Sequence, residues 1–160
     1  MDLVNVRIDR VIGNPKQEFA VVVRSDEKAF LIFVGEQEAI AIFRELKGFK
    51  VQRPLPHDLV VGVMTAFDIS VRAVVISSIV QNVFCATLLL TQELDGTTGV
   101  KRNEVRLDLR ASDAMIIALK KGLQLHAARE VIDAVEDVTP LLGEADEFGT
   151  DGNPAEEESE

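Results

Sequence analysis

One of the two histidines in the chain, His57, is followed directly by Asp58 in the segment QRPLPHDL. The ordinary pKa of histidine lies close to neutral pH, so a histidine beside a carboxylate can give or take a proton during a reaction. The same pair also suits the start of a helix, where Asp58 can accept a hydrogen bond from a free backbone N–H and offset the helix dipole. The two residues alone leave both interpretations open.

Two acidic residues, Glu36 and Glu38, follow Gly35 at the start of a helical pattern. Carboxylate oxygens are the ligands that Mg²⁺ and Mn²⁺ prefer, so this pair could bind a divalent cation. Acidic residues in the first turn also stabilise a helix through its dipole, without any ligand. The pair is therefore a candidate metal site with a structural alternative.

A third group of polar residues lies in the stretch LDLRASDA. Asp108 and Arg110 share one face if the strand continues that far, and Asp113 falls in the first turn of the next helix, for which Ser112 is the predicted N-cap. Such a group can hold a metal or a phosphate. It can equally be an ion pair that fixes the junction between strand and helix.

Taken together, these groups have the composition of a divalent-metal nuclease site. Carboxylates would hold Mg²⁺ or Mn²⁺, the metal would activate water and neutralise charge on the phosphate, a histidine would move the proton, and an arginine would bind the phosphate. The chain contains no P-loop and no GxSxG, GxGxxG or HExxH motif. The hypothesis requires three separate segments to meet in one place, which only the fold can decide.

The elements that would position these residues follow from apolar periodicity. Residues 35–48 show the helical spacing of Ala39, Ile42, Phe43 and Leu46, and Gly48 is a plausible stop. A second helix over residues 56–67 is almost wholly apolar, so we expect it to be buried. The remaining predicted elements are strands at 3–12, 18–25, 29–35, 70–80, 83–92 and 104–110, and helices at 112–122 and 127–136.

This order predicts an α+β fold with a largely antiparallel or mixed sheet and about four helices. The strands come in blocks of three, each followed by two helices, which differs from the single alternation of a doubly wound sheet. The stretches EAIAIFRELKG and DAMIIALKKG are similar to each other. We therefore expect an internal duplication of a unit of three strands and two helices.

The net charge of −10 comes mostly from the C-terminus. Residues 143–160 carry eight acids and no Lys or Arg, which leaves 19 of the 27 acidic residues against all 17 basic ones in the rest of the chain. We expect residues 1–138 to form one domain and residues 139–160 to be a disordered acidic tail.

Cellular location and redox chemistry are also constrained by the composition. The single cysteine, Cys85, lies in an apolar run and is predicted to be a small buried side chain. No stretch reaches the length of a membrane span, and the first residues do not have the pattern of a signal peptide. A cytoplasmic protein that does not bind membranes is the expectation.

The three polar motifs resemble those of the bifunctional nuclease domain family. The family pattern is roughly Ile/Val-Gly-Glu-x-Glu-Ala, then Pro-Arg-Pro-x-Thr-His-Asp-Leu, then Asp-Ala-Arg-Pro-Ser-Asp-Ala, and the chain has VGEQEA, QRPLPHDL and LDLRASDA in that order. The resemblance covers about residues 1–138 and implies an α+β domain that is dimeric and cleaves DNA and RNA. Three positions depart from the pattern: Pro56, Leu109 and Ala111 replace Thr, Ala and Pro.

The nuclease hypothesis assigns roles to individual residues, most of them at positions that match the family pattern, all as expectations. His57, Asp58 and Asp113 are the candidate catalytic residues, and Asp113 could also ligate a metal. Arg53, Arg110 and Ser112 are the candidate substrate-binding residues, and Glu36, Glu38 and Asp108 are the candidate ligands of Mg²⁺ or Mn²⁺. The alternatives are a non-catalytic dimeric regulatory module and a domain that binds a small anion at helix N-termini.

Overall fold

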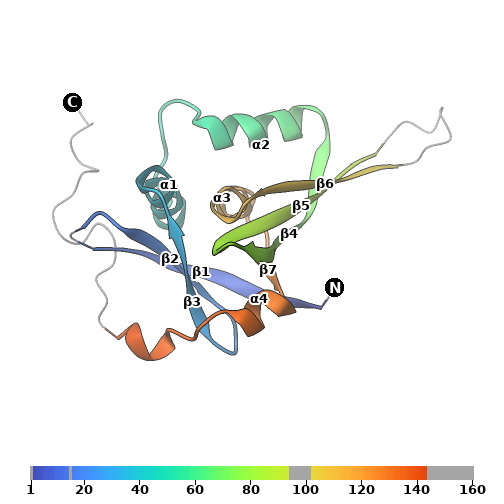
Figure 1. Cartoon of the computed structure of the whole chain (residues 1–160). Helices are drawn as coiled ribbons and strands as arrows, with labels where there is room; N and C mark the ends of the chain where they lie inside the picture. Colours follow the sequence, from blue (N-terminus) through green and yellow to red (C-terminus); the bar gives the residue numbers. More distant parts are fainter. Residues whose placement is uncertain (1, 15, 94–101, 144–160) are drawn as a thin grey trace.

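The computed structural model describes residues 2–14, 16–93 and 102–143, without the side chain of Arg102. Strands and helices follow the order of Figure 1, in which the chain is coloured from blue to red. The strands are β1 (Leu3–Gly13), β2 (Phe19–Arg24), β3 (Ala29–Val34), β4 (Ile69–Val80), β5 (Val83–Glu93), β6 (Arg102–Arg110) and β7 (Leu125–Ala128). The helices are α1 (Glu36–Lys47), α2 (Pro56–Ala66), α3 (Ala111–Lys121) and α4 (Arg129–Ala134), followed by a 3₁₀ turn at Thr139–Leu141.

The seven strands form one mixed sheet in the order β3-β2-β1-β7-β4-β5-β6. Two antiparallel meanders, β1–β3 and β4–β6, are joined through the short strand β7, which pairs antiparallel with β1 and parallel with β4. Long β1 reaches both halves, because Leu3–Val6 pair with β7 and Arg7–Gly13 pair with β2. The predicted α+β fold with a mixed sheet and four helices is confirmed. The internal duplication stays a prediction.

Helices α1 and α3 pack side by side against the sheet, with α2 outside them and α4 near the opposite side (Figure 1). Helix α3 lies at the centre, and its residues Ala114–Ala118 are buried, as its apolar sequence predicts. Met115 and Ile116 belong to the same core as Val74, Ile76 and Leu88 of the sheet. The central position of α3 matters for function, because the Asp113 motif lies at its first turn.

Several local signals in the sequence act as predicted. Helices α1 and α3 end at Gly48 and Gly122, both in the left-handed conformation (φ 72° and 61°) that glycine adopts without steric cost. The β4–β5 hairpin turns at Gln81 and Asn82, whose φ values of 50° and 63° fit a two-residue turn of type I′. Local sequence therefore sets where these elements stop.

Helix α2 contradicts the prediction that it is buried. It contacts its neighbours along one side only, and Met64 is its only buried residue. Leu59, Val63 and Phe67 are 65%, 47% and 64% exposed. A wholly apolar helix is buried only if other elements cover it on both sides. No described part of this chain covers the outer side of α2.

Three smaller predictions also need correction. Ser112 is not the N-cap of α3, because the helix begins one residue earlier, at Ala111, and Ser112 is buried inside its first turn. Strand β7 was missed, because LHAA is too short to show a period. Cys85 is half-buried rather than buried.

The ordered chain also continues past the predicted boundary at residue 138. The 3₁₀ turn follows it, and Leu142 is buried against Val22 and Ala29. The predicted acidic tail otherwise falls on residues 144–160, outside the described residues. No helix of the described chain is long and apolar enough to cross a membrane.

Candidate active site

Four side chains from the three motifs meet beside the first turn of α3. His57 Nε2, at the start of α2, lies 2.9 Å from Oδ1 of Asp113. Arg110, the last residue of β6, donates from Nε and Nη2 to the two carboxylate oxygens of Asp113 at 2.8 and 2.9 Å. It also donates from Nη1 to Oε1 of Glu38 on α1, at 2.8 Å. We call these four residues the His57 cluster.

Asp113 is ionised in the His57 cluster, and this decides the role of the histidine. Its hydrogen bonds with Arg110, and then the one with His57, hold the pKa of Asp113 below its ordinary value of 3.8, although burial opposes the shift. The hydrogen bonds to Asp113, and then that to Glu38, raise the pKa of Arg110, although burial opposes the shift. An ionised carboxylate can only accept hydrogen bonds, so Nε2 of His57 must carry the proton that it shares with Asp113. In the neutral ring, Nδ1 is then the free base.

Exposure of the His57 cluster is uneven. The side chains of His57, Asp113 and Glu38 are 24%, 23% and 19% exposed, whereas that of Arg110 is 62% exposed. Arg110 has five N–H groups, and three of them make the bonds described above. Two N–H groups of Arg110 therefore make no hydrogen bond to a described residue and could bind an anion.

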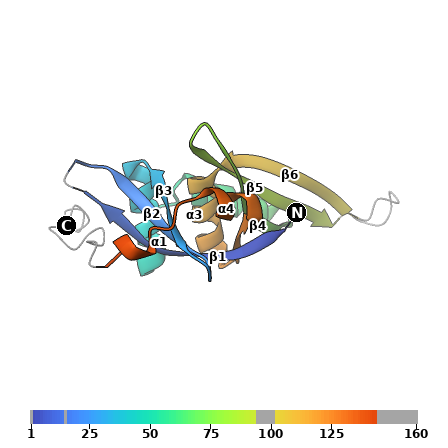
Figure 2. The same ribbon diagram turned by 60° about the horizontal axis from the view of Figure 1, so that its bottom comes forward.

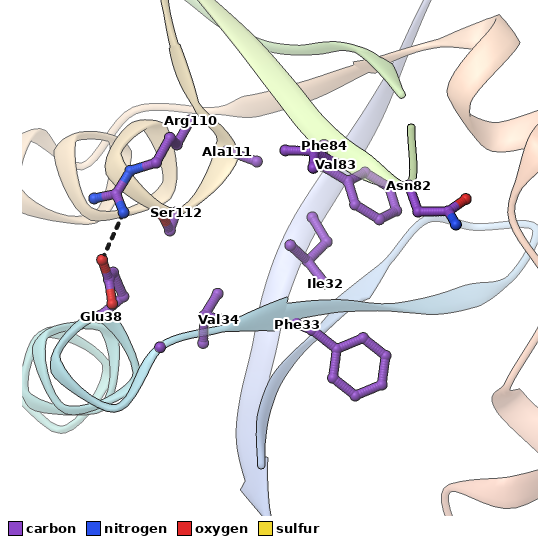
Figure 3. A pocket seen from close by; sticks show the side chains of 11 residues that line it. Ile32, Phe33, Val34, Glu38, Asn82, Val83, Phe84, Arg110, Ala111 and Ser112 are labelled. Atoms are coloured by element: carbon purple, nitrogen blue, oxygen red, sulfur yellow. Dashed lines mark hydrogen bonds and ion pairs between the residues drawn. The ribbon is translucent and has the colours of Figure 1, made fainter. Parts of the chain in front are cut away.

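A hollow of about 210 Å³ adjoins the exposed side of the cluster. It lies between the end of β3, the β4–β5 turn and the start of α3, and Figure 3 shows Glu38 and Arg110 joined at its rim. Phe33 is another lining residue and is 73% exposed. Gly35 belongs to the same wall, and a Cβ at this position would lie 2.6 Å from Oε2 of Glu38.

A second network, centred on Lys120, lies away from the hollow. Lys120 Nζ is 2.6 Å from Oδ1 of Asp58 and also contacts Oε1 of Glu45, so it connects α3 with α2 and α1. Asp58 accepts a hydrogen bond from the backbone N–H of Leu55 at 2.8 Å, which caps α2. The bonds to Lys120 and Leu55 lower the pKa of Asp58. Burial alone would lower the pKa of Lys120, but the bonds to Asp58 and Glu45 outweigh it and raise that pKa.

The structure thus separates the predicted site residues into two groups. His57, Asp113, Arg110 and Glu38 converge, and Ser112 lines the adjacent hollow. The side chains of the remaining candidates form no hydrogen bond or ion pair with the cluster; these are Glu36, Arg53, Asp58 and Asp108. Of these, Asp58 belongs to the Lys120 network, and the other three have exposed side chains that form no hydrogen bond or ion pair with a described residue.

Of the three candidate metal ligands, only Glu38 belongs to the His57 cluster in this arrangement. Among residues 2–14, 16–93 and 102–143, no group of three His, Cys, Asp or Glu side chains could hold an ion. Both oxygens of Asp113 and one oxygen of Glu38 accept hydrogen bonds from Arg110. These carboxylate oxygens serve Arg110 in this arrangement, and the Mg²⁺ or Mn²⁺ expected from the sequence stays a prediction.

Sequence reasoning missed two features of the site. Phe33 is an outward-pointing residue of β3, and alternation with the buried Phe30 and Ile32 was the signal for its exposure. The role of Lys120 had only a weak signal, namely a lysine in the last turn of an otherwise apolar helix. Its two acidic partners are 62 and 75 residues away in sequence, so no local pattern could identify them.

Comparisons with known proteins agree with the motifs. The chain is 26% identical over 147 residues to uncharacterized proteins from two strains of Mycobacterium tuberculosis, covering 88% of this chain and 82% of theirs. It is 28% identical over 126 residues to bifunctional nuclease 2 of Oryza sativa subsp. japonica, covering 76% of this chain and 37% of that protein. The family model for the bifunctional nuclease domain matches residues 21–139, which is more than half of the chain. The chain therefore belongs to the bifunctional nuclease domain family.

Proposed function

We propose that this protein is a nuclease and that the His57 cluster is its catalytic site. The proposal depends on one observation: three motifs far apart in sequence place a histidine, its carboxylate partner, an exposed arginine and Glu38 in one hydrogen-bonded chain. Membership of the family and the name of the rice relative support cleavage of nucleic acid as the reaction.

His57 is the proton-transfer group in this proposal. Its Nε2–H is held by ionised Asp113, which leaves Nδ1 to accept a proton from the attacking hydroxyl or water. The imidazolium that forms is stabilised by the same carboxylate and can then protonate the leaving oxygen. Asp113 is a positioning residue, and Arg110 in turn fixes the orientation of Asp113 through two parallel hydrogen bonds.

Arg110 and Phe33 supply substrate contacts in the proposal. The two remaining N–H groups of Arg110 suit a phosphodiester oxygen, since a guanidinium binds phosphate through paired N–H groups. Phe33 lies exposed in the wall of the same hollow, where a nucleobase can stack on its ring. An unpaired strand offers its bases for such stacking, so single-stranded substrates should be preferred over duplexes.

The proposed steps use no metal ion, and a mechanism that depends on Mg²⁺ or Mn²⁺ is the alternative that the experiment separates from them. The experiment is cleavage of labelled single-stranded and duplex DNA and RNA with Mg²⁺, with Mn²⁺ or with EDTA. We expect cleavage to persist in EDTA, since His57 and Arg110 provide the proton transfer and the phosphate contact. Complete loss in EDTA with recovery on adding Mn²⁺ would contradict this and favour the metal-dependent mechanism.

The variants for this assay are His57→Gln and Phe33→Ala. His57→Gln should lower kcat by at least about 100-fold, the usual contribution of a general acid or base. Phe33→Ala should raise KM for single strands by about 5- to 100-fold, because stacking of a base on an aromatic ring is worth about 1–3 kcal/mol. The matched control is Phe49→Ala, which truncates another exposed phenylalanine (57% exposed) and should leave KM unchanged. Activity that survives His57→Gln would refute the proposed site.

The second candidate function is a non-catalytic module whose ion pairs only join helices. The exposed apolar side of α2 favours it, because such surfaces commonly bind partners. If this candidate is correct, His57→Gln lowers the melting temperature and no purified preparation cleaves nucleic acid above background. A loss of cleavage at unchanged melting temperature favours the nuclease.

A further inference from the structure

Strand β6 forms an open edge of the sheet (Figure 2). Its residues pair with β5 on one side, and no other described residue hydrogen-bonds to its backbone. The opposite edge differs, because the segment after α4 closes the start of β3: Val138 N donates to Ala29 O, and Ala29 N donates to Asp137 and Thr139. A long unpaired edge is a template for another strand, so proteins normally cover it or pair it.

The side chains of β6 alternate in two ways along its length. From Glu104 to Arg110, residues with even numbers are charged and change sign at each step: Glu104, Arg106, Asp108 and Arg110. On the other face, Val105, Leu107 and Leu109 are apolar, and the first two are 45% and 44% exposed. These apolar residues pair with Leu90, Leu88 and Ala86 of β5, so they continue the face of the sheet that forms the core.

We propose that β6 pairs antiparallel with β6 of a second copy of this chain, across a two-fold axis at Leu107. In this register Arg106 faces Asp108 of the partner subunit. Arg110, whose guanidinium already binds Asp113 and Glu38, lies opposite Glu104 of the partner subunit. On the apolar face, Leu107 faces itself and Val105 faces Leu109 of the partner subunit. Each cross-strand pair is thus either oppositely charged or wholly apolar, which is the pairing that stabilises antiparallel strands.

Other registers are less favourable for identifiable reasons. A shift by two residues places Arg106 against itself and Glu104 against Asp108, which are like charges. A shift of one residue places the apolar face of one strand on the charged side of the other. A shift by four residues restores opposite charges, but it places Asn103 against Leu107 in place of an apolar pair.

The exposed residues of α2 fit the same dimer. Helix α2 lies on the helix side of the sheet, above β6 in Figure 1, and its Leu59, Val63 and Phe67 are exposed. An isologous pairing keeps corresponding faces of the two sheets together, so both copies of α2 lie on one side of the joined sheet.

The strand pairing is tested by reversing charges in the full chain. The wild type should sediment as a dimer at micromolar concentration, and Arg106→Glu should weaken dimerisation by roughly tenfold or more, because two symmetric pairs become like-charged. The double variant Arg106→Glu/Asp108→Arg restores opposite charges only in the Leu107 register, and dimerisation should recover. Arg72→Glu, on an exposed arginine of the interior strand β4, is the matched control and should have no effect.

Cross-linking tests the register independently of charge. In a Cys85→Ser background, a cysteine replacing Leu107 lies directly opposite its own copy, about 5 Å away between Cβ atoms. A cysteine replacing Val105 lies about 13 Å along the strand from its copy. A short bismaleimide should therefore join Leu107→Cys much faster than Val105→Cys.

A wild type that stays monomeric, an Arg106→Glu variant that dimerises like the wild type, or a double variant that does not recover would overturn the proposal. Faster cross-linking at position 105 would overturn the assigned register. The proposal does not depend on nuclease activity, since all these measurements report assembly and none reports cleavage.

Discussion

Asp113→Asn is the most informative single substitution in this protein. An amide can still accept from Nε2 of His57 on one side, but its NH₂ group then faces the N–H donors of Arg110. The histidine loses the charge that stabilises its protonated form, and the arginine loses its bidentate partner. If the His57 cluster is catalytic, activity should fall by at least about 100-fold.

The cost in stability should be small by comparison. A hydrogen bond to a charged group contributes about 1.5–3 kcal/mol. The part contributed by Arg110 is discounted toward 0–1 kcal/mol because that side chain is 62% exposed and screened by solvent. The free energy of unfolding should therefore fall by about 1–2 kcal/mol, which lowers the melting temperature by roughly 3–8 °C for a domain of this size.

The assay pairs single-turnover cleavage with urea unfolding of the same samples. Glu27→Gln is the matched control, because Glu27 also accepts two hydrogen bonds from an arginine, Arg129 Nη1, at 2.7 and 2.9 Å. It should leave cleavage unchanged. Equal losses of cleavage in both variants, or a loss in Asp113→Asn no larger than its unfolded fraction explains, would refute the catalytic role of the cluster.

The remaining predictions concern the residues around the cluster. Lys120→Met removes the cation shared by two carboxylates and should lower the free energy of unfolding by about 1–3 kcal/mol in chemical denaturation, with both acids left unpaired. Gly35→Ala should displace the Glu38 carboxylate, since the added Cβ meets Oε2; the melting temperature should change little, and a crystal structure should show the Glu38–Arg110 bond broken. The pKa of Asp58 in the folded protein lies below its ordinary value of 3.8. Its contribution to stability is therefore present above about pH 4 and is lost as the pH falls through the lowered pKa. Asp58→Asn should flatten the acid limb of a curve of unfolding free energy against pH.

Local residue preferences made the ends of several helices and strands predictable. Elements that depend on distant partners in the fold were not predictable in this way. The ends of α1 and α3 follow from glycines that adopt positive φ, and the β4–β5 turn follows from two polar residues that adopt the same region. Strand β7 has four residues and no visible period, yet it joins the two halves of the sheet through pairing with β1 and β4. Its identity depends on partners more than 40 residues away, which no local pattern contains.

The candidate site divides in the same way. The residue types of the three motifs and the family to which they belong can be read from the sequence, because they depend on side-chain chemistry and residue order. Packing of the helices is what makes His57 and Arg110 share Asp113, whereas Asp58, one residue from His57, pairs with Lys120. Adjacent residues at a helix start point in different directions, so the packing of α2 against α3 assigns one to the cluster and the other to the framework.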